Sequence, residues 1–445
     1  MNSRTFTKSD QEFVWEEVKL ADVCELISRG ITPSYTEKDG VVVINQKCIR
    51  DNMVNLDLSR LTNPQKRKIP EHKYLKSYDV LINSTGVGTL GRVAQVKSIN
   101  DKMTVDSHVT IVRGNEKVSP EFLGYNLFMQ QPNIENLAEG STGQTELSRI
   151  RLGETIRVQL PPINEQKVIA QIFSALDQKI ETNNLINNKL EEMAQAIFKQ
   201  WFVDFEFPND NGNPYKTSGG EMVKSELGMI PKNWEVTTFR SFTSNVLGGD
   251  WGKENEQGNY KKAVYCLRGA DIPEVREGRR GALPKRYILE KNHINKKLTS
   301  GDIVVEISGG SPTQSTGRIT YINDLMLSKY DEDFVCTNFC RAITLEDPKY
   351  MYYFYFYWKM LYDLNVFFQF ENGTTGIKNL DINSFLDRFK IVSPGIELVK
   401  RFDNLIRPIV DMIQINGNEN LKLSKTRDTL LPKLMSGEIR VRLEN

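Results

Sequence analysis

Residues 161–201 have the sequence PPINEQKVIAQIFSALDQKIETNNLINNKLEEMAQAIFKQW. Apolar side chains recur in this stretch at alternating spacings of four and three residues, which is the heptad pattern of a coiled-coil seam. The pattern predicts one long helix that packs along its length against a second helix. The members of the predicted seam are Ile169, Phe173, Leu176, Ile180, Asn183, Asn187, Leu190, Ala194, Ile197 and Trp201.

A second seam with the same spacing lies 233 residues further along the chain. Both seams carry two asparagines at the same central positions. A buried asparagine destabilises an apolar seam unless it is paired, so its usual use is to fix the register of the helices. The members of the second seam are Phe402, Ile406, Ile409, Ile413, Asn416, Asn420, Leu423, Arg427, Leu430 and Leu434.

The asparagines also limit how the two helices can pair. In an antiparallel pair, Asn183 would face Asn420 and Asn187 would face Asn416, but a parallel pair in register would also match asparagine to asparagine. We favour the antiparallel pair because each helix follows its own globular segment, and a twofold relation between the segments places them at opposite ends. Two ordinary amphipathic helices that pack on separate cores are the alternative.

The whole chain repeats once, with an offset that grows from 219 to 233 residues. Each repeat opens with a globular segment of short apolar runs bounded by Gly, Asn, Asp and Ser, and it closes with one of the two helices. Small loop insertions explain the growth of the offset. The matching stretches are Trp15-Glu-Glu-Val and Trp234-Glu-Val, Tyr78-Asp-Val-Leu-Ile and Gly301-Asp-Ile-Val-Val, Gly91-Arg-Val and Gly317-Arg-Ile, Gly140-Ser-Thr-Gly and Gly373-Thr-Thr-Gly, and Pro161-Pro-Ile and Pro394-Gly-Ile.

These patterns predict an α+β fold in which two pseudo-repeated mixed α/β domains are joined by two long antiparallel helices that form a coiled coil. A helix of about 40 residues is roughly 60 Å long. Residues 208–232 have the Asn-, Gly- and Ser-rich composition of a linker. The predicted segments are a first domain over 1–160, a central helix over 161–207, the linker over 208–232, a second domain over 233–393, and a C-terminal helix and tail over 394–445.

The composition of the chain excludes several classes of protein. The 445 residues carry a net charge of only +1, so any nucleic-acid site must be built from local charge. Five cysteines form no Cys-x-x-Cys pair, so we expect neither a disulfide framework nor a metal site. The N-terminus has no apolar signal segment, and charges interrupt the aromatic run 350–370. We expect this run to be a buried helix, no association with a membrane, and a cytoplasmic protein.

The chain also lacks the motifs of the enzymes that act on DNA. Leu160-Pro-Pro-Ile has neither the polar residue nor the aromatic residue of a methyltransferase loop, and Gly252-Lys253-Glu254 is an incomplete phosphate-binding loop. No nuclease signature is present, and the three histidines are scattered. We therefore expect a binding protein with no catalytic residues. A self-contained methyltransferase or nuclease is the weaker alternative, which binding of S-adenosylmethionine by the isolated chain would support.

Local positive charge recurs at matching places in the two repeats. Residues 275–297 carry eight Lys or Arg against two acids, and residues 50–76 carry seven against three. Concentrated charge of this kind is typical of a phosphate-binding surface, although a solvated loop has the same composition. Polar residues before these segments and glycine loops after them could contact bases or form turns. The candidate DNA-binding residues are Asn45, Gln46, Lys47, Arg50, Arg67, Arg92, Arg149, Arg268, Arg276, Arg279, Arg280, Arg286, Arg318 and Lys378.

With these features described, a resemblance to a known family can be stated. The stretch 160–177, LPPINEQKVIAQIFSALD, resembles the repeat signature of the specificity subunits of Type I restriction–modification systems. The loops that contain Tyr78-Asp-Val-Leu-Ile and Gly301-Asp-Ile-Val-Val are similar to the target-recognition domains of that family, and Lys433-Leu-Met-Ser-Gly-Glu-Ile-Arg-Val is similar to its C-terminal end. The second repeat departs from the signature, because Ile396-Glu-Leu stands where the first repeat has Ile163-Asn-Glu-Gln.

The resemblance implies a non-catalytic subunit that binds double-stranded DNA in a bacterial or archaeal cytoplasm. Each domain would read one half of a split, asymmetric target, and the coiled coil would set the gap between the halves. Two modification subunits would carry S-adenosylmethionine, and restriction subunits would use ATP and Mg, so this chain itself would bind no cofactor. A purely structural adaptor is the alternative function, and salt-dependent DNA binding would discriminate against it.

Overall fold

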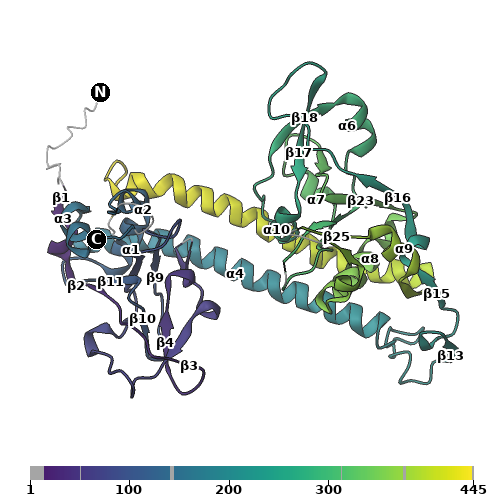
Figure 1. Cartoon of the computed structure of the whole chain (residues 1–445), viewed down its shortest axis with the longest axis horizontal. Helices are drawn as coiled ribbons and strands as arrows, with labels where there is room; N and C mark the ends of the chain where they lie inside the picture. The colour runs from purple at the N-terminus through teal and green to yellow at the C-terminus, as the bar shows by residue number, and fades with distance from the viewer. Residues whose placement is uncertain (1–14, 51, 141–144, 312, 374–376, 443–445) are drawn as a thin grey trace, which may run out of the picture. The chain divides into compact units, whose positions relative to one another are not determined.

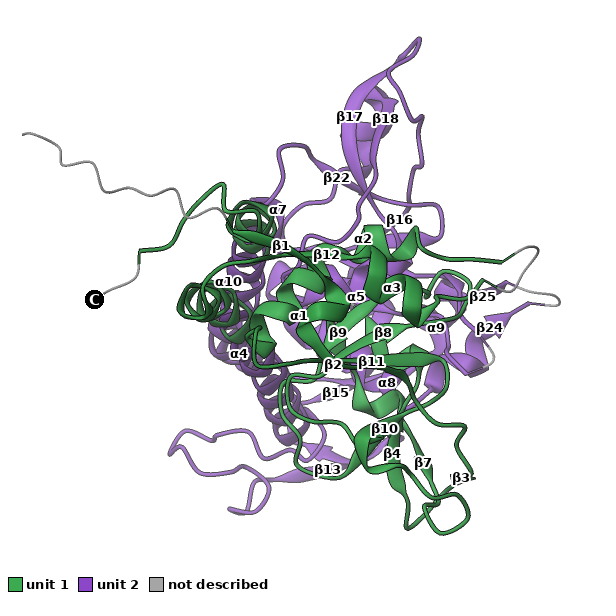
Figure 2. Cartoon of the chain, turned by 90° about the vertical axis from the view of Figure 1, so that its left-hand side faces the viewer, with its two compact units in different colours: residues 1–178, 424–445 green, residues 179–423 purple. Residues whose placement is uncertain are grey.

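The computed structural model describes residues 15–50, 52–140, 145–311, 313–373 and 377–442. The chain divides into two compact units, shown in different colours in Figure 2. Unit 1 comprises residues 1–178 and 424–445, and unit 2 comprises residues 179–423. Each unit therefore contains one globular segment together with its own stretch of both long helices, α4 (Ile163–Phe202) and α10 (Ile396–Met435) (Figure 1).

Unit 1 is built around a four-stranded antiparallel sheet in the order β2-β11-β8-β9. A second sheet has the order β10-β4-β7-β3, in which β10 and β4 run parallel. The runs VLIN in β8 and VTIVR in β11 are buried throughout, as expected of central strands that are covered on both faces. The strands are β1 (Glu16–Lys19), β2 (Cys24–Arg29), β3 (Tyr35–Thr36), β4 (Val41–Ile44), β5 (Ile49–Arg50), β6 (Met53–Val54), β7 (Arg60–Thr62), β8 (Val80–Asn83), β9 (Val93–Gln95), β10 (Met103–Val105), β11 (Val109–Gly114) and β12 (Arg157–Leu160), and the helices are α1 (Pro120–Met129), α2 (Gln131–Glu135), α3 (Arg149–Thr155) and the 3-10 helices η1 (Leu20–Val23), η2 (Gln46–Cys48), η3 (Leu56–Leu58) and η4 (Glu71–Lys73).

Unit 2 repeats this topology. Its main sheet has the order β16-β23-β19-β21, and its second sheet has the order β18-β17-β22, again with one parallel pair. A further sheet, β20-β25-β24, corresponds to isolated antiparallel bridges in unit 1, which join Glu146 to Thr85 and to Glu139. The strands are β13 (Met222–Ser225), β14 (Gly228–Pro231), β15 (Glu235–Thr238), β16 (Thr243–Gly248), β17 (Tyr260–Leu267), β18 (Lys285–Leu289), β19 (Ile303–Glu306), β20 (Ser308–Gly309), β21 (Ile319–Tyr321), β22 (Phe334–Cys336), β23 (Cys340–Leu345), β24 (Glu371–Asn372), β25 (Lys378–Leu380) and β26 (Lys390–Ser393), and the helices are α5 (Ile272–Arg276), α6 (Glu290–Lys296), α7 (Asp324–Leu327), α8 (Met351–Asp363), α9 (Ile382–Arg388) and the 3-10 helices η5 (Phe239–Phe242), η6 (Gly269–Asp271), η7 (Pro348–Tyr350) and η8 (Val366–Phe370).

The internal repeat predicted from the sequence is therefore present in the topology. The two Trp-Glu motifs begin β1 and β15, which pair with β12 and β26 directly before α4 and α10. The matched runs that begin at Tyr78 and Gly301 form the central strands β8 and β19. Helix α8, the aromatic run of the second repeat, is almost entirely buried, as predicted. Among the described residues, no helix is long and apolar enough to cross a bilayer.

The segment 208–232 differs from its prediction as a free linker. It contains the antiparallel hairpin β13–β14, and Tyr215 stacks on Phe207, which in turn stacks on Trp234. Asn209 accepts hydrogen bonds from the backbone of Asn211 and Asn213. The Asn- and Gly-rich composition thus forms ordered turns here, since Asn and Gly are also the residues that tight turns require.

The two long helices pair as the seams predict. Each helix has 40 residues, and every predicted seam position is buried or half-buried. Within unit 2, Asn183 donates a hydrogen bond to Asn420 at 2.8 Å, and Asn416 donates one to Asn187 at 2.9 Å. Within unit 1, Arg427 donates to Asp177 at 2.8 Å. In all of these pairs residue numbers rise along one helix as they fall along the other, so the predicted antiparallel pairing is confirmed.

Candidate nucleic-acid interface

The polar strand end of unit 1 is part of a tight turn. The side-chain oxygen of Asn45 caps η2 by accepting a hydrogen bond from the backbone N–H of Lys47, and its amide nitrogen donates to the carbonyl of Leu58. Gln46 lies over the glycine loop that follows β8, where its side-chain oxygen is 3.4 Å from the hydroxyl of Thr85. Asn45 therefore uses both ends of its amide to form the turn, while Lys47 is exposed to solvent.

The predicted cations of unit 1 are mostly exposed. Arg67 lies in the loop before η4, and Arg50 ends β5. Arg92, in contrast, folds back onto its own loop and donates to the carbonyl of Gly88 at 2.9 Å. This hydrogen bond fixes the loop between β8 and β9, so Arg92 has a role in loop structure in addition to any contact with a ligand.

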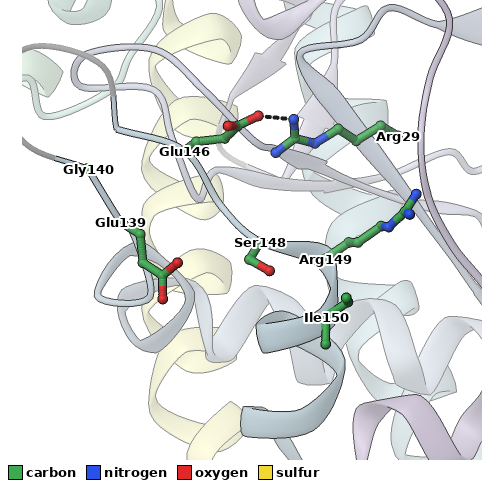
Figure 3. Close-up of a pocket in the computed structure, with 7 residues that line it drawn as sticks. All are labelled: Arg29, Glu139, Gly140, Glu146, Ser148, Arg149 and Ile150. Atoms are coloured by element: carbon green, nitrogen blue, oxygen red, sulfur yellow. Dashed lines mark hydrogen bonds and ion pairs between the residues drawn. The ribbon is translucent and has the colours of Figure 1, made fainter.

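A pocket of about 600 Å³ lies beside Arg149, at the first position of α3 (Figure 3). Arg29 also lines this pocket, where it pairs with Glu146 and donates to the carbonyl of Leu147. Desolvation and the neighbouring charge of Arg149 lower the pKa of Arg29. Glu139 and Glu146 also line the pocket, but they pair with Arg151 and Arg29. Among the described residues, Arg149 has no carboxylate partner and is the cation there that is available to an anionic ligand.

Arg29 and the pocket were not predicted from the sequence. Arg29 ends β2, and the residues of the 139–150 loop lie more than a hundred positions away in the chain. They meet because β2 and β8 both pair with β11, and Glu146 and Leu147 pair with the residues that directly follow β8. The predicted loops 140–143 and 373–376 fall largely on residues 141–144 and 374–376, which lie outside the described residues.

Three predicted cations of unit 2 are held by internal carboxylates. Arg268 donates two hydrogen bonds at 2.8 Å to Asp271, and Arg318 donates two at 2.6 Å to Glu306. Asp271 and Glu306 are buried, so each guanidinium neutralises a charge that would otherwise be costly. Lys378 likewise pairs with Glu371 at 2.9 Å. These side chains shape the loops of unit 2. The list of cations drawn from the sequence did not show that each of them has a carboxylate partner.

Arg276 is also directed inward. It lies against Tyr355 and Glu191, and the charge of these neighbours raises its pKa further above the usual range. The loop that follows it packs directly on α10, where a Cβ atom at Gly417 would lie 2.4 Å from the backbone of Gly278. Gln414 donates to the carbonyl of Arg276 at 3.0 Å. Arg276 therefore anchors the basic segment of unit 2 to the helices instead of facing solvent.

The remaining predicted cations of unit 2 are accessible. Arg279 is exposed and pairs with Glu277, and Arg280 lies 5.1 Å above the ring of Tyr330. Arg286, on β18, stacks 4.2 Å above the ring of Trp251. These three arginines can face a polyanion, since stacking on an aromatic ring leaves the N–H edge of a guanidinium available.

Neither a metal site nor a thiolate site is found in the part of the chain that the structure describes. No group of three or more His, Cys, Asp or Glu side chains is placed to bind a metal ion there. Burial raises the pKa of Cys266 and of Cys336 to about 12, so both thiols stay protonated at neutral pH.

Comparison with known proteins gives one consistent result. Residues 14–192 match the family described as the Type I restriction modification DNA specificity domain. The chain is 24% identical to the Type I restriction enzyme HindI specificity subunit of Haemophilus influenzae, over 96% of this chain and 99% of that protein. It is 27% identical to the Type I restriction enzyme MjaIX specificity subunit of Methanocaldococcus jannaschii, over 96% of this chain and 94% of that protein.

A solved structure shares the fold. The S subunit of a Type-I restriction-modification system from M. genitalium aligns with a TM-score of 0.56 and 15% identity, over 96% of this chain and 98% of that chain. The repeated units, the paired helices and the family match together define a protein that recognises DNA. Over nearly its whole length the chain resembles specificity subunits of the Type I restriction–modification class, and the resemblance predicted from its sequence is confirmed.

Proposed function

We propose that this chain recognises a bipartite, asymmetric site in double-stranded DNA, with one half-site read by each unit. One observation carries the proposal: the same sheet topology occurs in both units, but the accessible cations on it differ. Unit 1 presents Lys47, Arg67 and Arg149, whereas unit 2 presents Arg280 and Arg286. Two copies of one scaffold with different surface chemistry are suited to reading two different short sequences.

The exposed cations are assigned to contacts with DNA, and the internally paired ones to loop shape. Lys47, Arg67 and Arg149 would bind phosphates or base edges in the first half-site. Arg268, Arg318 and Lys378 would act indirectly, by holding the loops of unit 2 in position. The pocket that Arg29 and Arg149 share is assigned as a site where unit 1 binds a phosphate of the DNA.

The paired helices are proposed to set the unspecified gap between the half-sites and to bind the modification subunits. Helix α4 exposes Leu185 and Met193, and α10 exposes Met412 and Ile415. Exposed apolar side chains of this kind are typical of protein-binding surfaces. We assign S-adenosylmethionine to the modification subunits, of which we expect two, and ATP and Mg to restriction subunits that join them.

The first test is a genome-wide map of methylated bases in cells that express this chain with its modification subunit. We expect a new split motif with two unequal halves and a fixed gap. A palindromic motif would contradict the assignment of different half-sites to the two units. The absence of any new methylation by a stably assembled complex would contradict the proposal as a whole.

A second test separates the two units. Charge reversal of Arg149 should weaken recognition of one half-site, and charge reversal of both Arg279 and Arg280 should weaken recognition of the other. Each variant serves as the control for the other, because both leave the other unit unchanged. Binding to DNA with one half-site scrambled shows which half each variant affects. Equal effects on both halves would contradict the division of labour.

A further inference from the structure

An arginine stacks on an aromatic ring at the edge of the second sheet in both units. In unit 1 the guanidinium carbon of Arg60 lies 3.4 Å from the centre of the Tyr35 ring. In unit 2 the guanidinium carbon of Arg286 lies 4.2 Å from the centre of the Trp251 ring. Both arginines belong to the strand that pairs antiparallel with the middle strand of that sheet, β7 with β4 and β18 with β17.

The two stacks lie in the same part of the repeat, but they are two residues apart in strand register. Arg60 pairs with Val43, one residue before the end of β4, and Arg286 pairs with Val264, three residues before the end of β17. Gly30 precedes Tyr35, and Gly249 precedes Trp251. A Cβ atom at Gly30 would lie 2.1 Å from the carbonyl of Val105, the last residue of β10. A Cβ atom at Gly249 would lie 2.1 Å from the carbonyl of Cys336, the last residue of β22. The carbonyls of these glycines each accept a hydrogen bond at 2.8 Å from a lysine, Lys73 or Lys296. These two contacts make Gly30 and Gly249 equivalent, so the two stacks share a location in the fold without matching residue for residue.

The chain reaches the same arrangement by different local routes. In unit 1, Tyr35 pairs with Thr62, and Arg60 lies two residues before Thr62, so both side chains point to the same face of the sheet. In unit 2, Lys253 pairs with Tyr287, which would place Trp251 on the face opposite to Arg286 if the strand were regular. Gly252 has a φ of +59° and turns the chain, which brings the Trp251 ring to Arg286.

Neither arginine is used inside the protein. Within the described residues, the side chains of Arg60 and Arg286 form no hydrogen bond and no ion pair. The Nε atom of Arg286 is buried, so its terminal Nη1 and Nη2 atoms are the donors left for a ligand. This sets them apart from Arg268 and Arg318, which are neutralised by buried acids. The rings beneath them are 42% exposed for Tyr35 and 37% exposed for Trp251, so both stacks are open to solvent.

A stacked guanidinium is well suited to one kind of contact. The ring covers one face of the guanidinium and restricts its rotation, so the planar N–H edge remains as the binding surface. That edge matches a pair of acceptors in one plane, such as O6 and N7 of guanine or two oxygens of one phosphate. A two-stranded antiparallel ribbon such as β17–β18 is also narrow enough to enter the major groove of DNA.

We propose that Arg60 and Arg286 are DNA-contacting residues on the corresponding sheets of the two units, one for each half-site, and that each presents its guanidinium edge to a bidentate acceptor on the target. The inference rests on the proposed function and deepens it, because it assigns one positioned contact to each unit. Arg60 was not among the residues predicted from the sequence. Tyr35 and Trp251 are positioning residues that hold the arginines.

The test uses the intact complex of this chain with its modification subunits, once the methylated motif is known. For wild type and for Arg60→Lys, Arg60→Gln, Arg286→Lys and Arg286→Gln, methylation is measured on DNAs in which each base pair of each half-site is changed in turn. Affinity for the unchanged target is measured at several salt concentrations. If the arginine reads a base, the lysine variant should lose about tenfold of the discrimination at one base pair in one half-site only.

If the acceptor is a phosphate, the glutamine variant should instead bind every sequence more weakly, and its salt dependence should fall by about one counterion. Either result supports the contact and identifies the acceptor. Unchanged selectivity, affinity and salt dependence in both Arg60 and both Arg286 variants would overturn the inference. A wild-type complex that methylates without sequence preference would instead contradict the proposed function, so the two failures are distinguishable.

Substitution of the rings gives a matched control. Tyr35→Phe and Trp251→Phe keep an aromatic face beneath the arginine and should behave as wild type. Tyr35→Ala and Trp251→Ala remove the face and should reproduce a large part of the effect of the lysine variant. Thermal unfolding confirms that each variant is folded, and equal effects of Phe and Ala at both positions would show that the ring does not position the arginine.

Discussion

The two units hold a buried aspartate at the same place and stabilise it with different side chains. In unit 1, Asp79 accepts two hydrogen bonds at 2.7 Å from Arg113, and in unit 2, Asp302 accepts one at 2.8 Å from Thr344. Arg113 and Thr344 occupy equivalent positions. Arg113 follows Val112, which pairs with Val80 at the start of β8. Thr344 follows Ile343, which pairs with Ile303 at the start of β19. The fold has kept the aspartate and the strand register while the partner has changed from an ion to a hydroxyl group.

This difference shows which features the shared topology requires. Both aspartates also accept a hydrogen bond from a backbone N–H three residues earlier, at 2.8 Å in unit 1 and 2.7 Å in unit 2. The backbone contact is therefore common to both units, while the side-chain contact is specific to one. Each unit can vary its side-chain chemistry on a retained backbone, which is what two different half-sites would demand.

The largest expected difference between the units comes from the partners of these aspartates. Arg113→Met leaves Asp79 buried without its cation, and it should lower the free energy of unfolding of unit 1 by about 3 to 5 kcal/mol. Thr344→Val removes one hydrogen bond to Asp302 and should cost unit 2 about 2 kcal/mol. Hydrogen exchange in denaturant, followed peptide by peptide, measures each unit. Equal losses would show that the two partners are energetically interchangeable.

The glycines beside the aromatic stacks should give equal effects in the two units. Gly30→Ala and Gly249→Ala each place a Cβ atom against the carbonyl of a neighbouring strand, so each should cost about 3 kcal/mol in its own unit. The same exchange experiment detects the loss. A large effect in one unit and none in the other would mean that the two contacts are not equivalent.

The asparagine layer of unit 2 gives a smaller effect. Asn187→Leu leaves the amide of Asn416 without its acceptor and should cost about 2 kcal/mol. The double variant Asn187→Leu and Asn416→Leu should recover most of this loss, because two leucines pack well in a seam, but it should lose the preference for one register. A double-mutant cycle measures the coupling, and strictly additive losses would show that the two amides do not act as a pair.

The smallest expected effect concerns pH and is confined to unit 2. Burial lowers the pKa of Lys329 from 10.5 to about 8, and its ammonium group donates to the carbonyl of Gly278 and to Gln414. The unfolded chain therefore binds more protons between these pH values, and the stability of unit 2 should rise with pH across this window.

Comparison with Lys329→Met isolates this contribution from the other groups that titrate there. Between pH 8 and 10, wild type should gain about 1 to 2 kcal/mol relative to the variant. Hydrogen exchange of unit 1 is the internal control and should not differ between the two proteins. A pH-independent difference in unit 2 would show that Lys329 keeps an ordinary pKa.

The two helical seams were predictable because the heptad pattern repeats every seven residues and can be recognised within one helix. Asn183 and Asn420 needed only matched positions in two such patterns to be assigned as partners. The strand topology was predictable only in outline, from matched runs such as those at Tyr78 and Gly301. The ordered hairpin within 208–232 was missed, since the residues of turns and of linkers have the same composition.

The site was predicted less completely than the fold. A list of cations cannot show that Arg318 forms an ion pair with Glu306, because the two residues meet only through the pairing of β19 with β21. It also cannot show that Arg60 stacks on Tyr35, since 25 residues separate them in the chain. Arg268 is the exception, because Asp271 follows three residues later, and an Arg-x-x-Asp spacing could have indicated a local ion pair.

The division of α10 between the two units has a consequence for the order in which the protein can fold during synthesis. The globular segment of unit 1 leaves the ribosome before that of unit 2, but the core of unit 1 also contains Leu431, Leu434 and Met435. Glu165, buried at the start of α4, pairs with Arg440. The unit whose globular segment is translated first can therefore be completed only after the whole of unit 2 has been translated.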